Sequence, residues 1–306
     1  MVSKRSILKS SIIYACITIG GIASVPAQAD TLGDIKESGR ITLGVRDSSG
    51  VLSYTLGPEK YVGYQVDICE QIVANIKQSL KLEKLDVRYQ LVTPNNRIPL
   101  LANKTIQMEC GSTTNNASRL TQVWFSPTTY VESVRIAVKA SSPAQNFSDL
   151  NGKTVASTSG STAVQAVRKL NKQATTPVVE LFGKDNADAF LLLETGRADA
   201  YAADGQILAT AISKSRNPAD YRILDQIFSV EPIAIMIPKD DIALKKIVDE
   251  TVKTMASNGA LAKLYDKWFL QSVPPQGNKV GLAASALTKA AWASPNDKPM
   301  EEYADK

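Results

Sequence analysis

The stretch MECGSTTNNASR, residues 108–119, is the most informative part of this chain. Its strand-like start ends at Gly111, and a dense patch of hydroxyl and amide side chains follows. Arg119 comes five residues after Thr114. Short hydrogen-bond donors beside one fixed positive charge, with no group that could cleave a bond, are typical of a site that binds an anion. The sequence therefore predicts an anion-binding loop here rather than a catalytic one.

Strand and helix patterns alternate on both sides of this loop. We expect strands at 41–45, 85–91, 106–110, 134–138, 154–157, 178–182, 198–202 and 233–237. We expect helices at 32–39, 67–80, 97–103, 162–171, 186–195, 206–214, 241–255 and 260–269. Asp67 is expected to be the N-cap or a first-turn acid of the second helix. Such alternation predicts βαβ units, and so an α/β fold with a mainly parallel sheet covered by helices on both faces.

Polar residues follow several of these strands directly. Arg46 comes after the first strand and Ser112 after the third. Ligands of such sheets bind beyond the carboxyl ends of the strands, so both residues stand where a site is expected. Together with Arg97 and the loop TSGST, residues 158–162, they suggest a ligand that carries two carboxylates.

Residues 1–29 have the pattern of a secretory signal peptide. A basic start precedes an apolar run over 12–25, and a small-x-small triplet at 27–29 is a typical cleavage site. A retained anchor, or a lipoprotein signal ending at Cys16, is the alternative reading. The apolar run is short and rich in Ser, Thr and Gly, which disfavours a membrane span. We expect an exported, soluble mature chain that starts near Asp30.

Composition excludes several classes of function. The chain has 306 residues, a net charge of +5 and no histidine. Removing the three basic residues of the signal peptide leaves about +2 (5 − 3), a balance that argues against a nucleic-acid partner. Without histidine the commonest general base and the commonest metal ligand are missing, so we expect no metal site and no cofactor. The remaining length of 277 residues (306 − 29) suits one large or two medium domains.

Two cysteines, Cys69 and Cys110, remain after cleavage. In an oxidising compartment they can form one disulfide, and the alternative is two buried free thiols. Sequence alone leaves both alternatives open, because it does not show whether the two Cα atoms lie within bridging distance. A zinc site made from two cysteines without histidine is disfavoured.

The chain resembles the amino-acid-binding periplasmic receptors of ABC importers, the solute-binding protein family 3, and among them the glutamate/aspartate-binding proteins. The resemblance covers about residues 31–275. It is carried by GVRDSS at 44–49, NRIPLL at 96–101, ECGSTTNN at 109–116, TSGST at 158–162 and DKWF at 266–269. The third of these segments is the most specific, whereas the last is typical of the wider family.

The resemblance implies a two-lobed periplasmic binding protein of type II, in which each lobe is a mainly parallel sheet flanked by helices and two hinge strands join the lobes. Lobe one would comprise 31–133 plus 233–275, and lobe two 138–228. Residues 276–306 would form a C-terminal tail, with one weak helical stretch at 282–292, that either wraps the surface or is partly disordered. The ligand would lie between the lobes, which close on it by a hinge motion.

The resemblance also assigns roles for the α-carboxylate of an amino acid. Arg119 would bind it in a bidentate fork, with Thr114 and Ser161 as further donors. The start of the helix at 162–171 would add oriented backbone N–H groups. The alternative for Arg119 is a solvated surface arginine.

Other residues would receive the rest of the ligand. Asp204 would take the α-ammonium, with oxygens from Ser112 and Thr158; its alternative role is a helix N-cap. Arg46 and Arg97 would hold the side-chain carboxylate. A neutral amide there would leave a buried guanidinium without its counter-charge, which costs several kcal/mol.

Two departures from the glutamate/aspartate pattern bear on ligand choice. Pro94 stands where those proteins carry a serine, and Asn186, also a predicted ligand-binding residue, stands near the position of a histidine. Pro94 has no donor and Asn186 carries no charge. The preference between aspartate, glutamate and a related ligand therefore stays open.

Three classes of function compete for this sequence. The favoured one is a monomeric periplasmic receptor that delivers an acidic amino acid to an inner-membrane ABC permease. An enzyme on the same fold, such as a dehydratase, would need Glu109 or Cys110 as its reactive group, and no histidine is there to activate Cys110. A sensory module would need a separate signalling partner.

Overall fold

The computed structural model describes residues 30–303. The predicted signal peptide, with its alternatives, lies outside the described residues. None of the helices within 30–303 is both long and apolar enough to cross a membrane.

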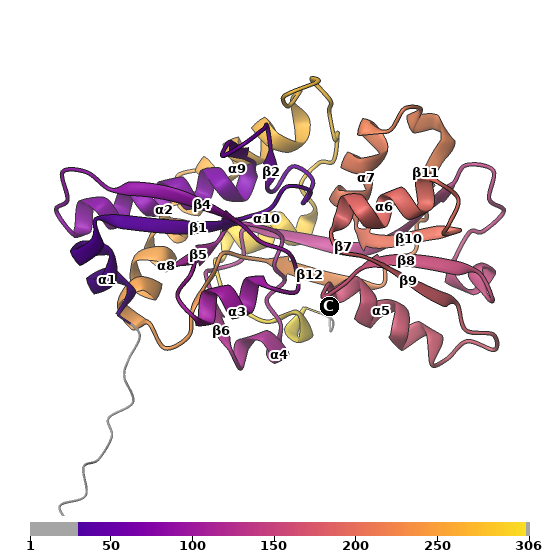
Figure 1. The fold of residues 1–306 in the computed structure, drawn as a ribbon, viewed down its shortest axis with the longest axis horizontal. Helices are drawn as coiled ribbons and strands as arrows, with labels where there is room; N and C mark the ends of the chain where they lie inside the picture. The colour runs from indigo at the N-terminus through magenta and orange to yellow at the C-terminus, as the bar shows by residue number, and fades with distance from the viewer. Residues whose placement is uncertain (1–29, 304–306) are drawn as a thin grey trace, which may run out of the picture.

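Two lobes lie side by side along the long axis of the molecule (Figure 1). The sheet of the first lobe has the order β4 (Asp86–Leu91), β1 (Arg40–Val45), β5 (Met108–Glu109), β13 (Met236–Pro238) and β6 (Val123–Phe125). The sheet of the second lobe has the order β11 (Tyr221–Ile223), β7 (Tyr130–Lys139), β10 (Ala200–Asp204), β8 (Thr154–Thr158) and β9 (Val179–Gly183), and β12 (Ser229–Ile233) pairs with β7. A small two-stranded sheet of β2 (Tyr54–Thr55) and β3 (Tyr61–Val62) belongs to the first lobe.

The predicted α/β fold class is confirmed, and both sheets are mixed, with parallel and antiparallel pairings in each. One strand in each runs against the others, β13 in the first lobe and β7 in the second. The chain enters the second lobe along β7, and β13 is the first strand that it forms after returning to the first lobe. The remaining strands share one direction, so their carboxyl ends meet at one edge of each sheet.

Helices cover the sheets. The first lobe contains α1 (Thr31–Ser38), α2 (Tyr64–Ser79), α3 (Arg97–Ala102), α4 (Ala117–Leu120), α8 (Ile242–Ser257), α9 (Ala260–Tyr265) and the π-helical turn Asp266–Leu270. The second contains α5 (Thr162–Asn171), α6 (Asn186–Glu194) and α7 (Gly205–Lys214), with 3₁₀ turns at Phe147–Leu150 and Pro218–Asp220. The first helix ends before Gly39, which lies in the left-handed region at φ 64°, as is common directly after a helix.

Two local predictions need correction. Asp67 is the first-turn acid of α2 and not its N-cap, because the helix begins three residues earlier, after Gly63. The Asp67 carboxylate accepts hydrogen bonds from Lys267 Nζ (2.6 Å) and Trp268 Nε1 (2.8 Å). The single strand expected at 233–237 is two strands. Apolar composition predicted one continuous strand there, but the chain changes from one sheet to the other within it.

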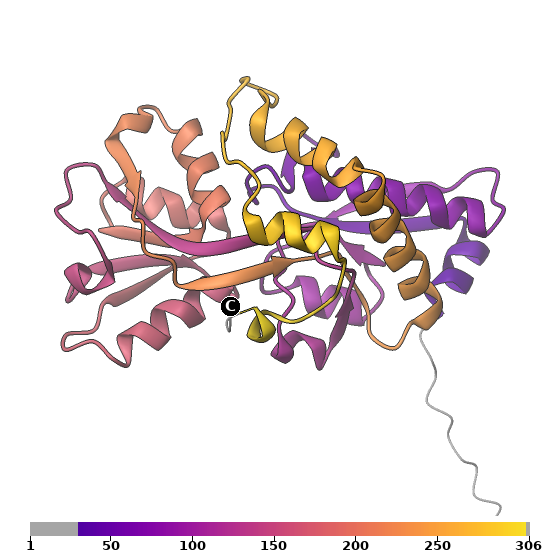
Figure 2. The same cartoon turned by 180° about the vertical axis from the view of Figure 1, so that it is seen from behind.

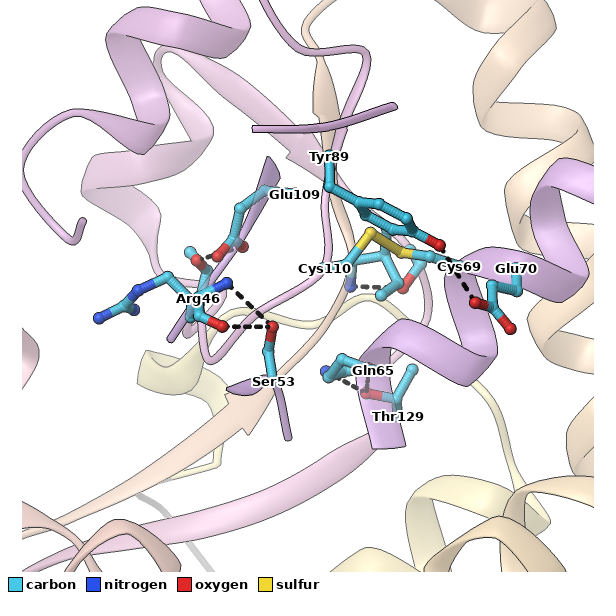
Figure 3. The surroundings of a disulfide bond; sticks show 12 residues. Arg46, Ser53, Gln65, Cys69, Glu70, Tyr89, Glu109, Cys110 and Thr129 are labelled. Carbon is cyan, nitrogen blue, oxygen red and sulfur yellow. Dashed lines mark hydrogen bonds between the residues drawn. A yellow bond between two sulfur atoms is a disulfide. The ribbon is translucent and has the colours of Figure 1, made fainter. Parts of the chain in front are cut away.

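The disulfide between Cys69 and Cys110 is formed, which decides between the two alternatives for these cysteines. It joins the middle of α2 to the residue directly after β5 (Figure 3). Both cysteines are fully buried in the core between α2 and the first sheet. The bond therefore fixes the strand end from which the predicted anion-binding loop begins.

Strands β7 and β12 pair antiparallel over residues 130–134 and 229–233 and connect the lobes (Figure 2). The tail helix α10 (Ala286–Ala293) packs beside them, and a short 3₁₀ turn (Met300–Glu302) follows it. Trp292 Nε1 donates to Thr129 O (2.8 Å), and Thr288 Oγ1 donates to Val131 O (3.1 Å). Of the two alternatives for the tail, its described part, up to residue 303, wraps the surface at the hinge.

Candidate ligand-binding site

A small cavity lies between the lobes. From the first lobe it is lined by Arg46, Pro94, Arg97, Ser112 and Thr114. From the second it is lined by Thr158, Ser161, Thr162, Ala163, Asn186, Ala203, Asp204 and Ile207. A larger groove nearby, lined by residues such as Tyr54, Phe190 and Lys214, includes none of the arginines. The chemistry predicted from the sequence therefore belongs to the smaller cavity.

The ends of parallel strands position these side chains. Arg46 directly follows β1, Thr158 is the last residue of β8, and Asp204 is the last residue of β10. Ser112 lies three residues after the end of β5. Both lobes thus present the carboxyl edges of their sheets to one shared space, as the topology requires.

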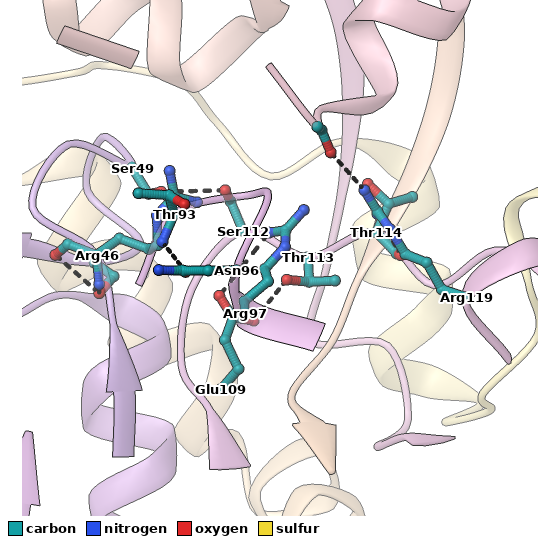
Figure 4. Close-up of polar contacts among 12 residues, drawn as sticks. Arg46, Ser49, Thr93, Asn96, Arg97, Glu109, Ser112, Thr113, Thr114 and Arg119 are labelled. Atoms are coloured by element: carbon teal, nitrogen blue, oxygen red, sulfur yellow. Dashed lines mark hydrogen bonds and ion pairs between the residues drawn. The ribbon is translucent and has the colours of Figure 1, made fainter. Parts of the chain in front are cut away.

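All the predicted site residues except Arg119 line this cavity. Arg119, on α4, is buried beside it, so the surface reading of this arginine is wrong. Its Nη1 donates to Thr114 O (2.8 Å), and its Nη2 donates across the lobes to Gly160 O at 3.5 Å (Figure 4). Arg119 therefore lies at the rim of the cavity, where it contacts both lobes.

The cavity contains buried donors that are not satisfied by the protein. Arg46 and Arg97 are 1% and 2% exposed. Within residues 30–303, Nε and Nη2 of Arg46 and Nε and Nη1 of Arg97 have no hydrogen-bond partner, and neither does Ser161 Oγ. Burying a charged donor without an acceptor is costly, so such groups indicate a place for acceptor oxygens. Guanidinium forks fit carboxylates in a bidentate way.

One anion faces these cations from within the protein. Glu109 Oε1 lies 3.9 Å from Arg97 Nη1, and Glu109 Oε2 accepts a hydrogen bond from Thr113 Oγ1 (2.6 Å). Burial, and then the neighbouring Arg119, lower the pKa of Arg97 to about 9, while Glu109 opposes the shift. Burial also lowers the pKa of Arg46, again against the influence of Glu109. At neutral pH the guanidinium of Arg97 therefore stays charged.

The loop passes these charges closely because it contains a glycine. A Cβ on Gly111 would lie 2.2 Å from Glu109 Oε1 and 2.8 Å from Arg46 Cγ. A side chain at this position would push the carboxylate and the arginine stem apart. The dense polar motif pointed to the loop, but nothing in the sequence identified Glu109 as the anion behind the arginines.

Asp204 supplies the acidic side of the cavity. It occupies the N-cap position of α7, but its side chain makes no capping hydrogen bond, so the capping role is wrong for the carboxylate. Burial first, and then Glu231 and Glu132, raise its pKa well above the usual range, while Arg97 acts in the opposite direction. A ligand cation beside Asp204 would favour its ionised form.

Asn186 also joins the second lobe to the first. Thr158 Oγ1 donates to Asn186 Oδ1 (2.7 Å), and Asn186 Nδ2 donates to Ser48 O (2.9 Å). Ser112 Oγ lies 3.2 Å from Ser49 Oγ in the first lobe. Asn186, in the first turn of α6, therefore serves closure as well as lining the cavity.

Sequence reasoning missed part of the lining. Ala163, Ala203 and Ile207 lie near helix starts and at the end of β10, beside residues that were predicted. Small and apolar residues of this kind carry no chemical signal of their own. Only their neighbours in the fold identify them.

The chain matches the family model described as bacterial extracellular solute-binding proteins, family 3, over residues 41–271. It is 38% identical over 303 residues to the L-glutamate/L-aspartate-binding protein of Pseudomonas aeruginosa, covering 97% of this chain and 98% of that protein. It is 36% identical over 277 residues to the glutamate/aspartate import solute-binding protein of Escherichia coli, covering 90% and 92%.

The fold is also similar to that of solved structures. One is the crystal structure of an ancestral amino acid-binding protein described as a precursor of cyclohexadienyl dehydratase. The TM-score is 0.68 at 25% identity, with 78% of this chain and 99% of that chain covered. The matching family and the two sequence relatives are named for binding rather than for a catalysed reaction.

Proposed function

The chain belongs to the bacterial extracellular solute-binding proteins of family 3, and from this premise we propose that it is the periplasmic receptor of an ABC importer for an acidic amino acid, glutamate or aspartate. It captures the ligand between its lobes and delivers it, as a monomer, to an inner-membrane permease.

The observation that carries this proposal is the pair of buried guanidinium groups in the cavity. Arg46 and Arg97 keep N–H donors that no described protein atom accepts. A side-chain carboxylate supplies both the acceptors and the negative charge that they lack. Each charge-assisted hydrogen bond contributes on the order of 1.5–3 kcal/mol net, so two of them are enough to separate glutamate from glutamine.

The backbone part of the amino acid fits the remaining groups. Asp204 offers a carboxylate to the α-ammonium, and Ser161 Oγ is a buried hydroxyl without a partner among the described residues. Arg119 has five N–H positions, of which two point to Thr114 O and Gly160 O, so it keeps donors for an α-carboxylate at the rim. These roles make the second lobe the part that completes the site.

We propose binding without turnover. Cys110, the one candidate thiol in the loop, is held in the disulfide and is not a free nucleophile. Glu109 is buried, accepts a hydrogen bond from Thr113 and lies beside Arg97. Neither group is available to attack or deprotonate a bound amino acid.

A thermal-shift screen of residues 30–306 against the twenty amino acids, followed by calorimetry, tests the function. A ligand that binds only the native form raises the melting temperature. We expect glutamate and aspartate to raise it and glutamine to bind at least about 100-fold more weakly than glutamate. Equal affinity for glutamate and glutamine would contradict the proposal, and so would conversion of the ligand to a product.

A further inference from the structure

The lobes also touch through a residue beside the ligand cavity. Gln206, at the start of α7 in the second lobe, is fully buried, and its side chain enters a loop of the first lobe. Gln206 Nε2 donates to Ser49 O (3.4 Å), and Gln206 Oε1 accepts from Val51 N (3.3 Å). The neighbouring Ile207, not Gln206, is the residue that lines the cavity.

The loop is shaped to receive this amide. Gly50 has φ 60°, a left-handed conformation that L side chains rarely adopt. A Cβ there would lie 2.0 Å from Gln206 Oε1 and 3.1 Å from Thr210 Oγ1, one turn further along α7. A side chain at this point of the first lobe would displace the Gln206 amide from its contact and would strain the backbone.

The backbone of Gln206 is fixed from the hinge. Gln206 N donates to Glu132 Oε2 (3.0 Å), and Glu132 lies on β7, the strand that leads into the second lobe. Glu132 is itself held by Ser133 N (2.7 Å). The start of α7 is thus tied to the hinge strand, and its side chain is aimed at the loop around Gly50.

We propose that Gln206 is a closure residue: its side-chain amide holds the two lobes together through Ser49 O and Val51 N and thereby sets how strongly a ligand is retained. The inference rests on the proposed function, since retention presupposes a ligand between the lobes. Gln206 is a positioning residue that acts through the closed state. When the lobes separate, water replaces these partners, so only the net advantage of the protein–protein hydrogen bonds favours closure, and it does so whatever the ligand is.

A closure residue changes the affinity for the ligand without contacting the ligand. The apparent affinity of a ligand that needs the closed state is proportional to the population of that state. Loss of the two hydrogen bonds lowers this population. The closed complex then opens faster, so the loss should appear mainly in the dissociation rate.

The first test replaces Gln206 by Met, which keeps the length of the side chain and removes its donor and acceptor. Gln206→Met should weaken glutamate binding about tenfold, chiefly through faster dissociation in stopped-flow measurements.

Gln107→Met is the matched control. Gln107 also makes two backbone hydrogen bonds, accepting from Thr42 N (2.7 Å) and donating to Lys104 O (2.9 Å), but both lie within the first lobe. The control should leave the affinity for glutamate within about twofold of the parent. Equal losses of affinity in both variants would overturn the proposed closure role of Gln206.

A double-mutant cycle with Gly50→Ala tests the contact itself. The backbone strain caused by the added methyl group is present with or without Gln206, whereas the collision with Gln206 Oε1 is not. The affinity loss caused by Gly50→Ala should therefore be smaller in a Gln206→Ala background. Strictly additive losses would show that the two positions do not meet in the closed state.

Small-angle scattering without added amino acid separates this inference from the proposed function. Gln206→Met should increase the mean radius of gyration relative to the parent chain and to Gln107→Met. If the parent chain binds no amino acid, the proposed receptor function fails, and the scattering difference still decides whether Gln206 holds the lobes together. An identical radius of gyration for the three proteins would overturn the proposed closure role of Gln206.

Discussion

Arg97 Nη1 lies 3.9 Å from Glu109 Oε1, and both side chains are almost completely buried. The separation is too long for a hydrogen bond, so the carboxylate balances charge without occupying the donors of the guanidinium. Arg97 is therefore kept charged by one anion and still has N–H groups for a second one. This arrangement is what a site for an anionic ligand requires.

Replacement of Glu109 by Gln removes that balance. We expect the free energy of unfolding of the ligand-free protein to fall by about 3 kcal/mol, because a buried guanidinium loses its counter-charge. Urea unfolding followed by circular dichroism measures the loss. The rise in melting temperature caused by glutamate should become larger, since the ligand then supplies a missing negative charge.

Thr113→Val is the control for this variant. It removes the hydroxyl that donates to Glu109 Oε2 but leaves the charge in place. Its destabilisation should be about 1 kcal/mol, the usual value of one hydrogen bond. A larger loss for Thr113→Val than for Glu109→Gln would show that the hydroxyl, not the charge, matters at this position.

Arg97→Ala should distinguish the binding of the side-chain carboxylate from that of the α-carboxylate. We expect glutamate affinity to fall about 100-fold and glutamine affinity to fall less than about tenfold, because only glutamate has a second carboxylate to lose. Isothermal calorimetry with both ligands gives the two ratios. Arg119→Ala is the companion variant, and it should weaken both ligands alike, since both carry the same α-carboxylate. The assigned roles would be refuted by equal ratios for Arg97→Ala.

Much of the fold could be predicted because local pattern and tertiary environment agree. The helix at 162–171 is bounded as expected, since an amphipathic run follows the loop TSGST. The same agreement holds for β1, where a strand pattern coincides with burial between two parallel neighbours. Positions at the ends of these elements then follow from the topology of a parallel sheet.

What could not be predicted depends on contacts between distant segments. The split of 233–237 depends on which sheet each half joins, and Asp67 contacts Lys267, two hundred residues away. Within the site, the partner of Arg97 is decided by the fold, because a carboxyl in a strand pattern is compatible with many environments. The contact between Gln206 and the loop at Gly50 exists only when the lobes meet, so no local pattern encodes it.

The disulfide between Cys69 and Cys110 should contribute mainly to stability. It closes a loop with a sequence separation of 41, for which the loss of chain entropy on cross-linking gives about 4 kcal/mol. We expect the Cys69→Ala/Cys110→Ala variant to lose about 2–4 kcal/mol in guanidinium unfolding. Glutamate affinity should change less than about threefold, because neither cysteine lines the cavity among the described residues. A loss of binding in a fully folded variant would show that the bond also shapes the loop.

Asp204 makes ligand binding dependent on pH. Burial, with Glu231 and Glu132 nearby, raises its pKa well above 3.8, while Arg97 and Arg119 limit the shift. The folded protein therefore binds more protons than the unfolded chain between 3.8 and the raised pKa. Because the free energy of unfolding falls with pH wherever the folded state holds the extra proton, Asp204 lowers stability as pH rises through this window.

A bound α-ammonium reverses the effect, since an adjacent positive charge favours the carboxylate. Glutamate binding should therefore release up to about one proton below the raised pKa, and affinity should rise with pH across the same window. Calorimetry in buffers with different ionisation enthalpies measures the release.

In Asp204→Asn, proton release should vanish and affinity should fall about 100-fold. The ligand-free variant should be more stable than the parent at neutral pH, because it no longer buries an ionisable carboxyl group. Unchanged proton release in Asp204→Asn would assign the titration to another group, such as Glu132, and remove Asp204 as the receptor of the ammonium.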